Sequence, residues 1–280
     1  RVPHICRPGE TLSSSSREVF PGGKGLNQSI ALGRAGADVT HAGRTGQDGA
    51  WLVDRLRQAG AKADTVIVGD TPSGHAVIQV EDSGQNSIIL FPGENMKQTR
   101  RDIDATLACC PSDTILLLQN EINEIDYLIA EGARRGFRVC LNPAPFSPAI
   151  ASLPLASVDI LVVNETEAEG LVGTMGEEET VDALVRMLPD CEIVMTIGPE
   201  GLLYGKGNQR IRRPAEEAVV VDTTAAGDTF IGYFLAAQAE GMEADDALYF
   251  ASIASALCVA KPGACDAIPT RADVEAKLPA

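Results

Sequence analysis

The stretch Asp222–Phe230 (DTTAAGDTF) puts small residues, a glycine and a carboxylate at a predicted turn between a strand and a helix. The apolar run Ala218–Val221 before it predicts a strand, and Ile231–Ala237 after it predicts a buried helix. The first N–H groups of a helix lack internal partners and, together with the helix dipole, form an anion site. An anion site beside a potential general base, Asp228, suits phosphoryl transfer to a hydroxyl. The alternative is that Asp228 only caps the helix.

A second cluster, Pro21–Gln28 (PGGKGLNQ), opens a helix that is predicted to continue to Ala35. Its glycines allow a small ligand to approach the backbone closely. Lys24 and Asn27 add a cation and an amide at the start of that helix. Taken alone, the cluster favours a glycine-rich turn with a solvated lysine.

Two further motifs follow predicted strands. Asn164–Glu167 (NETE) comes directly after the apolar run Asp159–Val163 and offers a carboxylate and an amide, which suit a hydrated magnesium ion. The alternative is a helix cap with acidic residues in the first turn. Thr196–Gly201 (TIGPEG) follows another apolar run and, alone, is an ordinary turn. Neither a Walker A loop nor a GxGxxG fingerprint occurs in the sequence.

Composition excludes several classes of function. The 280 residues carry a formal net charge of −16, which argues against nucleic acid or an anionic membrane as a partner. No apolar run is long enough to span a bilayer. The seven cysteines are scattered and show no zinc spacing, so we expect reduced thiols in a cytoplasmic protein. The three histidines are too far apart in the sequence to suggest a metal cluster.

Short apolar strands alternate with helical segments from about residue 39 onward, which predicts an α/β fold with a doubly wound, mainly parallel sheet and helices on both faces. Ligands of such sheets collect at the carboxyl ends of the strands. The predicted strands are Val39–Gly43, Thr114–Gln119, Arg138–Asn142, Ile160–Val163 and Ile193–Ile197. The predicted helices include Gly49–Ala59, Ile122–Arg135, Thr180–Leu188, Asp228–Glu240 and Ala244–Ala260.

Two segments depart from this alternation. Gly74–Val80 and Asn86–Phe91 flank a polar turn and have the period-two pattern of a hairpin. Arg17–Phe20 reads as a further strand, so residues 12–20 and 73–92 together are expected to form a small β lid. An exposed small sheet has edges to cover, which favours self-association as a homodimer.

Taken together and in this order, the motifs GGKGxNQ, NETE, TxGxxG and DTxAAGDTF resemble those of the ribokinase-like (PfkB) carbohydrate kinases. The resemblance covers nearly the whole chain, from about Arg7 to the C-terminus, and implies one kinase domain over residues 1–280. It implies transfer of the γ-phosphate of ATP to the 5-hydroxyl of D-ribose, with Mg²⁺ and a K⁺ activator. A hexose, a nucleoside or deoxyribose remains an alternative acceptor.

The resemblance also implies roles for individual residues. Asp228 would accept the proton of the sugar hydroxyl, and the N–H groups of Ala225, Ala226 and Gly227 would hold the charge that develops on the phosphoryl group. The sugar would be bound by Gly23, Lys24, Asn27 and Glu121. The nucleotide would be bound by Asn164, Thr196, Gly198, Gly201, Gly227 and Ser252.

The resemblance implies two metal sites as well. Glu167 would position Mg²⁺ through water. The K⁺ ion would be held, mostly through backbone carbonyls, by Asp222, Thr224, Val259, Pro262 and Ala264.

The sequence departs from the family pattern at its start. The family begins with a further strand that ends in a Gly-Ser-x-Asn-x-Asp-like motif and supplies sugar contacts, whereas this sequence starts at Arg1 and soon reaches Arg7–Thr11. We therefore expect an open edge in the sheet and fewer sugar contacts. A nucleotide- or sugar-binding relative with impaired catalysis is the alternative from a different functional class.

Overall fold

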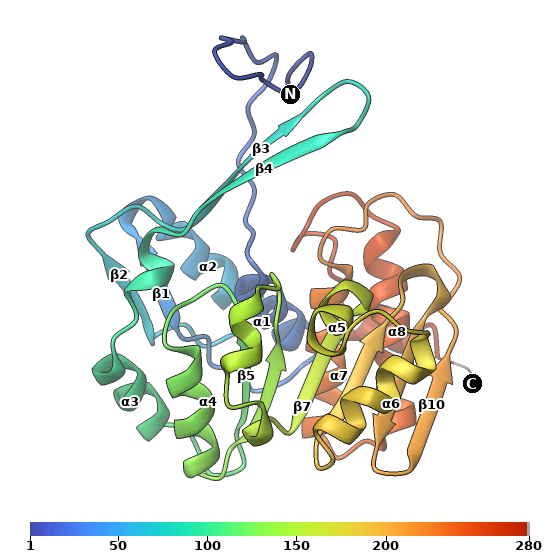
Figure 1. The fold of residues 1–280 in the computed structure, drawn as a ribbon. Helices are drawn as coiled ribbons and strands as arrows, with labels where there is room; N and C mark the ends of the chain where they lie inside the picture. The colour runs from blue at the N-terminus through green and yellow to red at the C-terminus, as the bar shows by residue number, and fades with distance from the viewer. Residues whose placement is uncertain (279–280) are drawn as a thin grey trace.

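The computed structural model describes residues 1–278 and has a twisted six-stranded sheet at its centre (Figure 1). The strand order is β10-β9-β8-β7-β6-β5, in which β5 to β8 are parallel and β9 and β10 are antiparallel additions at one side. The predicted mainly parallel sheet is confirmed. Its strands are β5 (Ile115–Gln119), β6 (Arg138–Asn142), β7 (Ile160–Asn164), β8 (Glu192–Thr196), β9 (Leu202–Lys206) and β10 (Gln209–Arg213).

Helices cover both faces of this sheet, because successive side chains of a strand point to opposite faces. Cys140 and Val162 belong to the apolar core on one face, whereas Leu141 and Leu161 belong to the core on the other. The first face is covered by α1 (Lys24–Arg34), α2 (Trp51–Gln58), α7 (Ala226–Ala239), α8 (Ala244–Val259) and α9 (Arg271–Glu275). The second face is covered by α3 (Arg100–Ala108), α4 (Ile125–Arg134), α5 (Glu165–Val172) and α6 (Glu177–Met187). Short 3₁₀ turns occur at Gln47–Gly49, Gly93–Lys97, Pro148–Ser152, Leu155–Ser157 and Gly198–Glu200.

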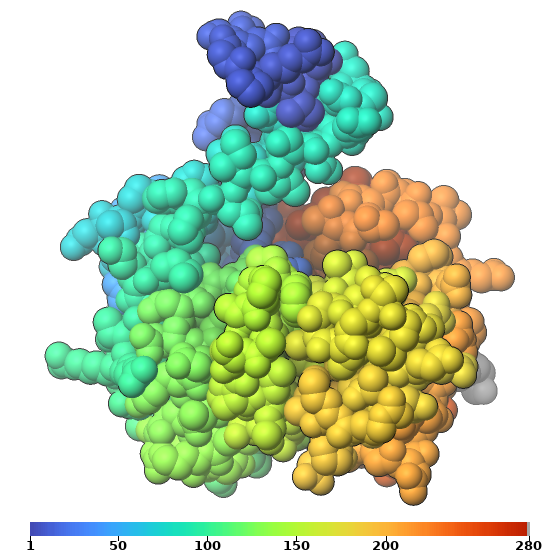
Figure 2. Space-filling model, in the orientation of Figure 1, coloured from blue at the N-terminus to red at the C-terminus, as the bar shows by residue number. Residues whose placement is uncertain are grey.

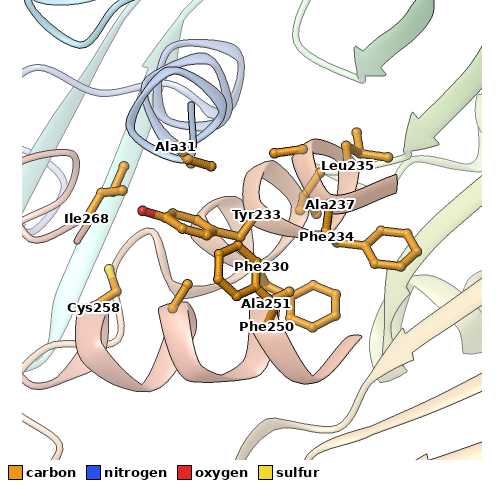
Figure 3. Close-up of a cluster of buried hydrophobic side chains, with 14 of the residues drawn as sticks. Ala31, Phe230, Tyr233, Phe234, Leu235, Ala237, Phe250, Ala251, Cys258 and Ile268 are labelled. Atoms are coloured by element: carbon orange, nitrogen blue, oxygen red, sulfur yellow. The ribbon is translucent and has the colours of Figure 1, made fainter. Parts of the chain in front are cut away.

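The helix α7 is the most deeply buried helix of the site. Every residue from Asp228 to Ala237 is buried, and Tyr233 and Phe234 are fully enclosed. Figure 3 shows the Tyr233 ring between α1, which carries Ala31, and α8, which carries Phe250 and Ala251. The single polar end of Tyr233 donates to the carbonyl of Pro269 at 2.8 Å, so burial leaves no hydroxyl unpaired there. This packing fixes the N-terminus of α7, and with it Asp228.

A separate two-stranded parallel sheet is formed by β1 (Gly43–Gly46) and β2 (Val66–Gly69). The strand predicted over Val39–Gly43 begins only at Gly43 in the structure. Before that residue, Thr40 makes only an isolated bridge to Lys62. Within residues 1–278, β5 ends the six-stranded sheet and does not pair with β1.

The predicted hairpin is confirmed as β3 (His75–Val80) and β4 (Asn86–Phe91). Figures 1 and 2 show it standing clear of the body of the molecule, with the N-terminal residues against its tip. Its apolar side chains are exposed on both faces. Val77 and Ile89 form one cross-strand pair, and Ile78 and Ile88 form the next pair, which points to the opposite face.

The prediction of a lid strand within residues 12–20 was wrong. Residues 12–20 contain no strand, and Val19 and Phe20 are exposed. The residues that reach the hairpin come from the very start of the chain instead. The N–H of Val2 donates to the carbonyl of Val80 at 3.0 Å, and the N–H of Cys6 donates to Oε1 of Gln79 at 2.9 Å.

The predicted strand Ala218–Val221 is also wrong. These residues lie outside every sheet of the described structure, and Val219 is 82% exposed. The backbone N–H groups of Val221 and Asp222 donate to the carbonyl of Val259 instead of to a neighbouring strand. The chain after β10 therefore approaches α7 as an open loop.

Candidate active site

Asp228 lies in the first turn of α7, is only 8% exposed, and has both carboxylate oxygens bound by amide groups of α1. Asn27 Nδ2 donates to Oδ2 at 2.8 Å, and Gln28 Nε2 donates to Oδ1 at 2.9 Å. Burial raises the pKa of Asp228, while Asn27, the charge of Lys24 and Gln28 act against that rise. The carboxylate is therefore held in one orientation by groups that favour its charged form.

The turn before Asp228 has the geometry of an anion site. Ala225 adopts a left-handed conformation with φ 62°, and α7 begins at the next residue. The N–H of Ala226 donates to the carbonyl of Thr223 at 3.3 Å, whereas within residues 1–278 no protein group accepts the N–H of Ala225 or Gly227. A Cβ added at Gly227 would have no neighbouring heavy atom within 4 Å. Since protein packing leaves this position open, the glycine keeps the backbone accessible to a ligand.

A second carboxylate, Glu121, lies just beyond the carboxyl end of β5 and binds the start of α1. The N–H of Lys24 donates to Glu121 Oε2 at 2.8 Å, and a Cβ added to Gly23, whose φ is 102°, would lie 3.8 Å from that oxygen. Burial raises the pKa of Glu121, and the contact with Lys24 opposes this rise. The sequence prediction that Gly23, Lys24 and Glu121 lie together matches this arrangement.

Asn164 and Glu167 form a capping box at the start of α5, which was the structural alternative for this motif. Asn164 Oδ1 accepts the N–H of Glu167 at 2.9 Å, and Glu167 Oε2 accepts the N–H of Asn164 at 3.0 Å. Burial raises the pKa of Glu167. Both side chains also line a cavity shared with Lys24 and Asp228, so the capping geometry and a ligand-binding role are compatible.

That cavity has a volume of about 210 Å³ and lies between α1, the strand ends of β6 to β8, and the N-terminus of α7. It brings together eight of the predicted site residues: Lys24, Asn164, Glu167, Thr196, Ala225, Ala226, Gly227 and Asp228. Lys24 is its cation, and Asp228 and Glu167 are its carboxylates. The remaining lining residues are Asn142, Ala144, Val162, Val163, Asn164, Thr196, Thr223, Ala225, Ala226, Gly227 and Ile231.

Three predicted nucleotide residues lie outside the lining of this cavity. Gly198 and Gly201 flank a 3₁₀ turn after β8, and a Cβ on Gly201 would come within 2.0 Å of the carbonyl oxygen of Arg213. Close packing of the backbone therefore already requires glycine there. Ser252 is buried in α8, and its hydroxyl donates to the carbonyl of Leu248 in the same helix.

Of the residues assigned to K⁺, Asp222 and Thr224 lie in the loop before α7, and Val259, Pro262 and Ala264 lie at the end of α8 and in the loop after it. Asp222 Oδ1 accepts the N–H and the hydroxyl of Thr224, and Oδ2 accepts the N–H of Gly263 at 3.0 Å. These bonds lower the pKa of Asp222. The carbonyl of Val259 accepts two N–H groups, and that of Ala264 accepts the N–H of Ala267. Among residues 1–278, no group of three or more His, Cys, Asp or Glu side chains is arranged to hold a metal ion.

Sequence reasoning assigned no role to the amides around Asp228 other than that of Asn27. Gln28 stands inside the quoted motif GGKGxNQ, and Gln119 and Asn142 each end a predicted strand, but each is separated from its partners by scores of residues. Only the long-range contacts of the folded chain bring them together. No signal in the sequence alone could have found them.

The fold and this site define the chain as a member of a known family: residues 2–271 match the model of the pfkB family of carbohydrate kinases, and the chain belongs to that family. It is 35% identical to the ribokinase of Haemophilus influenzae, over 96% of this chain and 91% of that protein.

Solved structures agree with this assignment. The ribokinase of Cryptococcus neoformans in complex with ADP has a TM-score of 0.89 and 32% identity, covering 99% of this chain and 95% of that one. The Arabidopsis thaliana ribokinase complexed with ribose and ATP has a TM-score of 0.87 and 32% identity, covering 98% and 92%. None of the helices within residues 1–278 is both long and apolar enough to cross a bilayer.

Proposed function

We propose that residues 1–280 act as one ATP-dependent sugar kinase that transfers the γ-phosphate to the 5-hydroxyl of D-ribose. The observation that carries the proposal is the buried carboxylate of Asp228, bound by Asn27 and Gln28, beside the N–H of Gly227, which has no partner among residues 1–278. The ribokinase relatives named above support ribose as the acceptor and ATP as the donor.

In this proposal Asp228 accepts the proton of the sugar hydroxyl as that oxygen attacks phosphorus. The backbone N–H groups of Ala225 and Gly227, at the positive end of α7, stabilise the charge on the transferred phosphoryl group. The N–H of Ala226 can join them only after releasing the carbonyl of Thr223. Positioning and electrostatic stabilisation are the main requirements of phosphoryl transfer.

The sugar is held by Gly23, Lys24, Asn27 and Glu121. Asn27 supports this assignment because its Oδ1 is buried and has no hydrogen-bond partner within the described residues. A buried acceptor without a donor is unfavourable, and a small movement of the Asn27 side chain on sugar binding would bring a sugar hydroxyl to it as the donor. Glu121 can accept a second hydroxyl while it keeps the N–H of Lys24.

The nucleotide lies along Asn164, Thr196 and Gly227, with Gly198, Gly201 and Ser252 at its adenosine end. Mg²⁺ would be held through water by Glu167 and would neutralise the charge of the phosphates. The donor set fits a hydrated cation, because Asp228, Glu167 and Glu121 surround the single cation Lys24 and leave an excess of negative charge.

A K⁺ ion would be held beside the anion site by Asp222 and by the carbonyls of Thr224 and Pro262. Val259 fits this set poorly, because its carbonyl already accepts two N–H groups, and Ala264 keeps one free lone pair. If K⁺ is bound at this site, replacing K⁺ by Li⁺ is expected to lower turnover without changing the fold.

We propose further that the protein forms a homodimer through the hairpin, whose apolar side chains are exposed on both faces.

All seven cysteines are free, which suits the reducing cytoplasm.

The test is ADP release with MgATP, K⁺ and one acceptor at a time: D-ribose, 2-deoxy-D-ribose, a hexose and a nucleoside. We expect D-ribose to give the highest kcat/KM, and Asp228→Asn to abolish the signal. Preference for another acceptor would move the chain to another kinase of the family. ATP binding without turnover of any acceptor would favour the impaired binding protein.

A further inference from the structure

Asp228 is bound by two amides, and one of them is itself held by further amides. Gln28 is fully buried, and its Nε2 donates to Asp228 Oδ1 at 2.9 Å and to Asn142 Oδ1 at 3.3 Å. Its Oε1 accepts Nε2 of Gln119 at 2.6 Å. Every polar atom of the Gln28 side chain therefore has a partner.

These partners determine which way the Gln28 amide faces. Asn142 Nδ2 donates to the carbonyl of Val162 at 3.0 Å, which leaves its Oδ1 directed at Gln28. The Asn142 oxygen and the Asp228 carboxylate both need a donor, so the NH₂ group of the Gln28 amide faces them and its oxygen faces Nε2 of Gln119 on β5. A flipped amide would set its oxygen against the carboxylate and lose all three bonds.

We infer that Gln28 is a positioning residue for Asp228, oriented by Gln119, and that this pair of amides fixes the direction in which the carboxylate meets the sugar hydroxyl. The inference rests on the proposed function, because it takes Asp228 as the base. The other charged groups that face Asp228 are Lys24 of α1, Glu121 beyond β5 and Glu167 of α5. None of these groups orients the Oδ1 atom, which Gln28 alone contacts at hydrogen-bond distance within the described residues.

The test compares Gln28→Met and Gln119→Met with the double variant. Methionine fills a similar volume to glutamine, so a merely space-filling role of Gln28 predicts little change in kcat. If Gln28 positions the base, Gln28→Met lowers kcat roughly tenfold to a hundredfold, while the KM values for both substrates stay within about twofold. Gln119→Met changes kcat in the same direction by a smaller factor. The double variant should be no slower than Gln28→Met, because both changes break one chain of contacts.

The pH profile gives a second readout. Loss of a donor to the carboxylate raises the pKa of Asp228, so the acid limb of kcat moves to higher pH in both single variants. Gln238→Met is the matched control: Gln238 is a part-buried amide of α7 outside the cavity, bonded to Arg138, and its loss should leave the limb in place. An unshifted limb with kcat near the wild-type value, or multiplicative effects in the double variant, would overturn the inference.

A direct titration separates this inference from the proposed function. The carboxyl signal of Asp228 can be followed by NMR in protein with isotope-labelled aspartate and assigned by its absence in Asp228→Asn. If no acceptor turns over, the proposed function fails, yet the titration midpoint should still rise in Gln28→Met. If the titration midpoint in both single variants equals that of the wild type, the positioning role of Gln28 is refuted and the proposed function is left unaffected.

Discussion

The backbone N–H of Lys24 and the carboxylate of Glu121, 97 positions apart in the sequence, are joined by a 2.8 Å hydrogen bond. This bond ties the first residue of α1 to the carboxyl end of β5. It gives Glu121 a structural contact in addition to its proposed contact with the sugar, and the two roles can be separated by mutation.

Glu121→Gln keeps an oxygen that can accept the N–H of Lys24 but removes the negative charge. We expect the KM for the sugar to rise roughly tenfold, because a hydrogen bond to a charged acceptor is stronger than one to a neutral amide, while the melting temperature stays close to that of the wild type. Steady-state kinetics with Glu121→Ala, which loses both contacts, is the comparison. An unchanged sugar KM in Glu121→Gln would remove Glu121 from the sugar site.

Asp228→Asn is expected to fold and to be at least as stable as the wild type at neutral pH. Burial raises the pKa of Asp228 in the folded state, so the charged form destabilises the fold above that pKa. This destabilisation is absent below the unfolded-state pKa of about 3.9 and grows as the pH rises through the folded-state pKa. The variant lacks it, so its melting temperature relative to the wild type should increase from acid to neutral pH. Thermal unfolding at several pH values checks this, and a variant that is less stable at every pH would contradict it.

The stability expected of that variant depends on Asn27. In Asp228→Asn, the new NH₂ group would face the NH₂ group of Asn27. The Asn27 amide can turn so that its Oδ1, which has no partner within the described residues, accepts a hydrogen bond from the new NH₂ group. The combined variant Asn27→Ala/Asp228→Asn should lose this rescue and melt below Asp228→Asn.

Two glycines of the same helix should respond in opposite ways. A side chain on Gly227 meets open space, so Gly227→Val should keep the melting temperature but block phosphate approach and abolish turnover. A Cβ on Gly232 would lie 2.4 Å from Cβ of Ala31, so Gly232→Ala should destabilise the fold by ~1–3 kcal/mol through overpacking. Calorimetry and ADP release on both variants check the pair. Full turnover in folded Gly227→Val would exclude the proposed phosphate position.

The hairpin offers a test of the dimer. Ile88 and Ile89 are adjacent in β4 and point to opposite faces. If one face is the dimer interface, only one of the variants Ile88→Lys and Ile89→Lys should sediment as a monomer. Sedimentation velocity at equal protein concentration measures this. Two variants that both sediment like the wild type would exclude the hairpin as the interface.

Local sequence patterns predicted the elements whose own residues determine them. The apolar strands β5 to β8 lie within a residue or two of the predicted ranges, because continuous apolar runs between helices are typical of buried parallel strands. The hairpin was equally clear from its period-two pattern and polar turn. The turn that carries Asp228 also lies where the glycine and the small residues indicated.

The failures have long-range causes. The run Ala218–Val221 has the composition of a strand, but the N–H of Val221 pairs with the carbonyl of Val259, the last residue of α8, and within the described residues no sheet edge accepts the run. The orientation of Asp228 was also beyond prediction, because Gln28 and Asp228 are 200 positions apart. Such contacts arise only from the packing of α1 against α7, shown in Figure 3.

The unpaired edge of β5 has a consequence for how the protein behaves at high concentration. Ile115 and Leu117 are only partly buried, and within residues 1–278 this side of the strand has no neighbour. An apolar strand with free backbone groups is a template on which another extended chain can add. A soluble peptide strand that pairs with this edge should therefore suppress precipitation at high protein concentration.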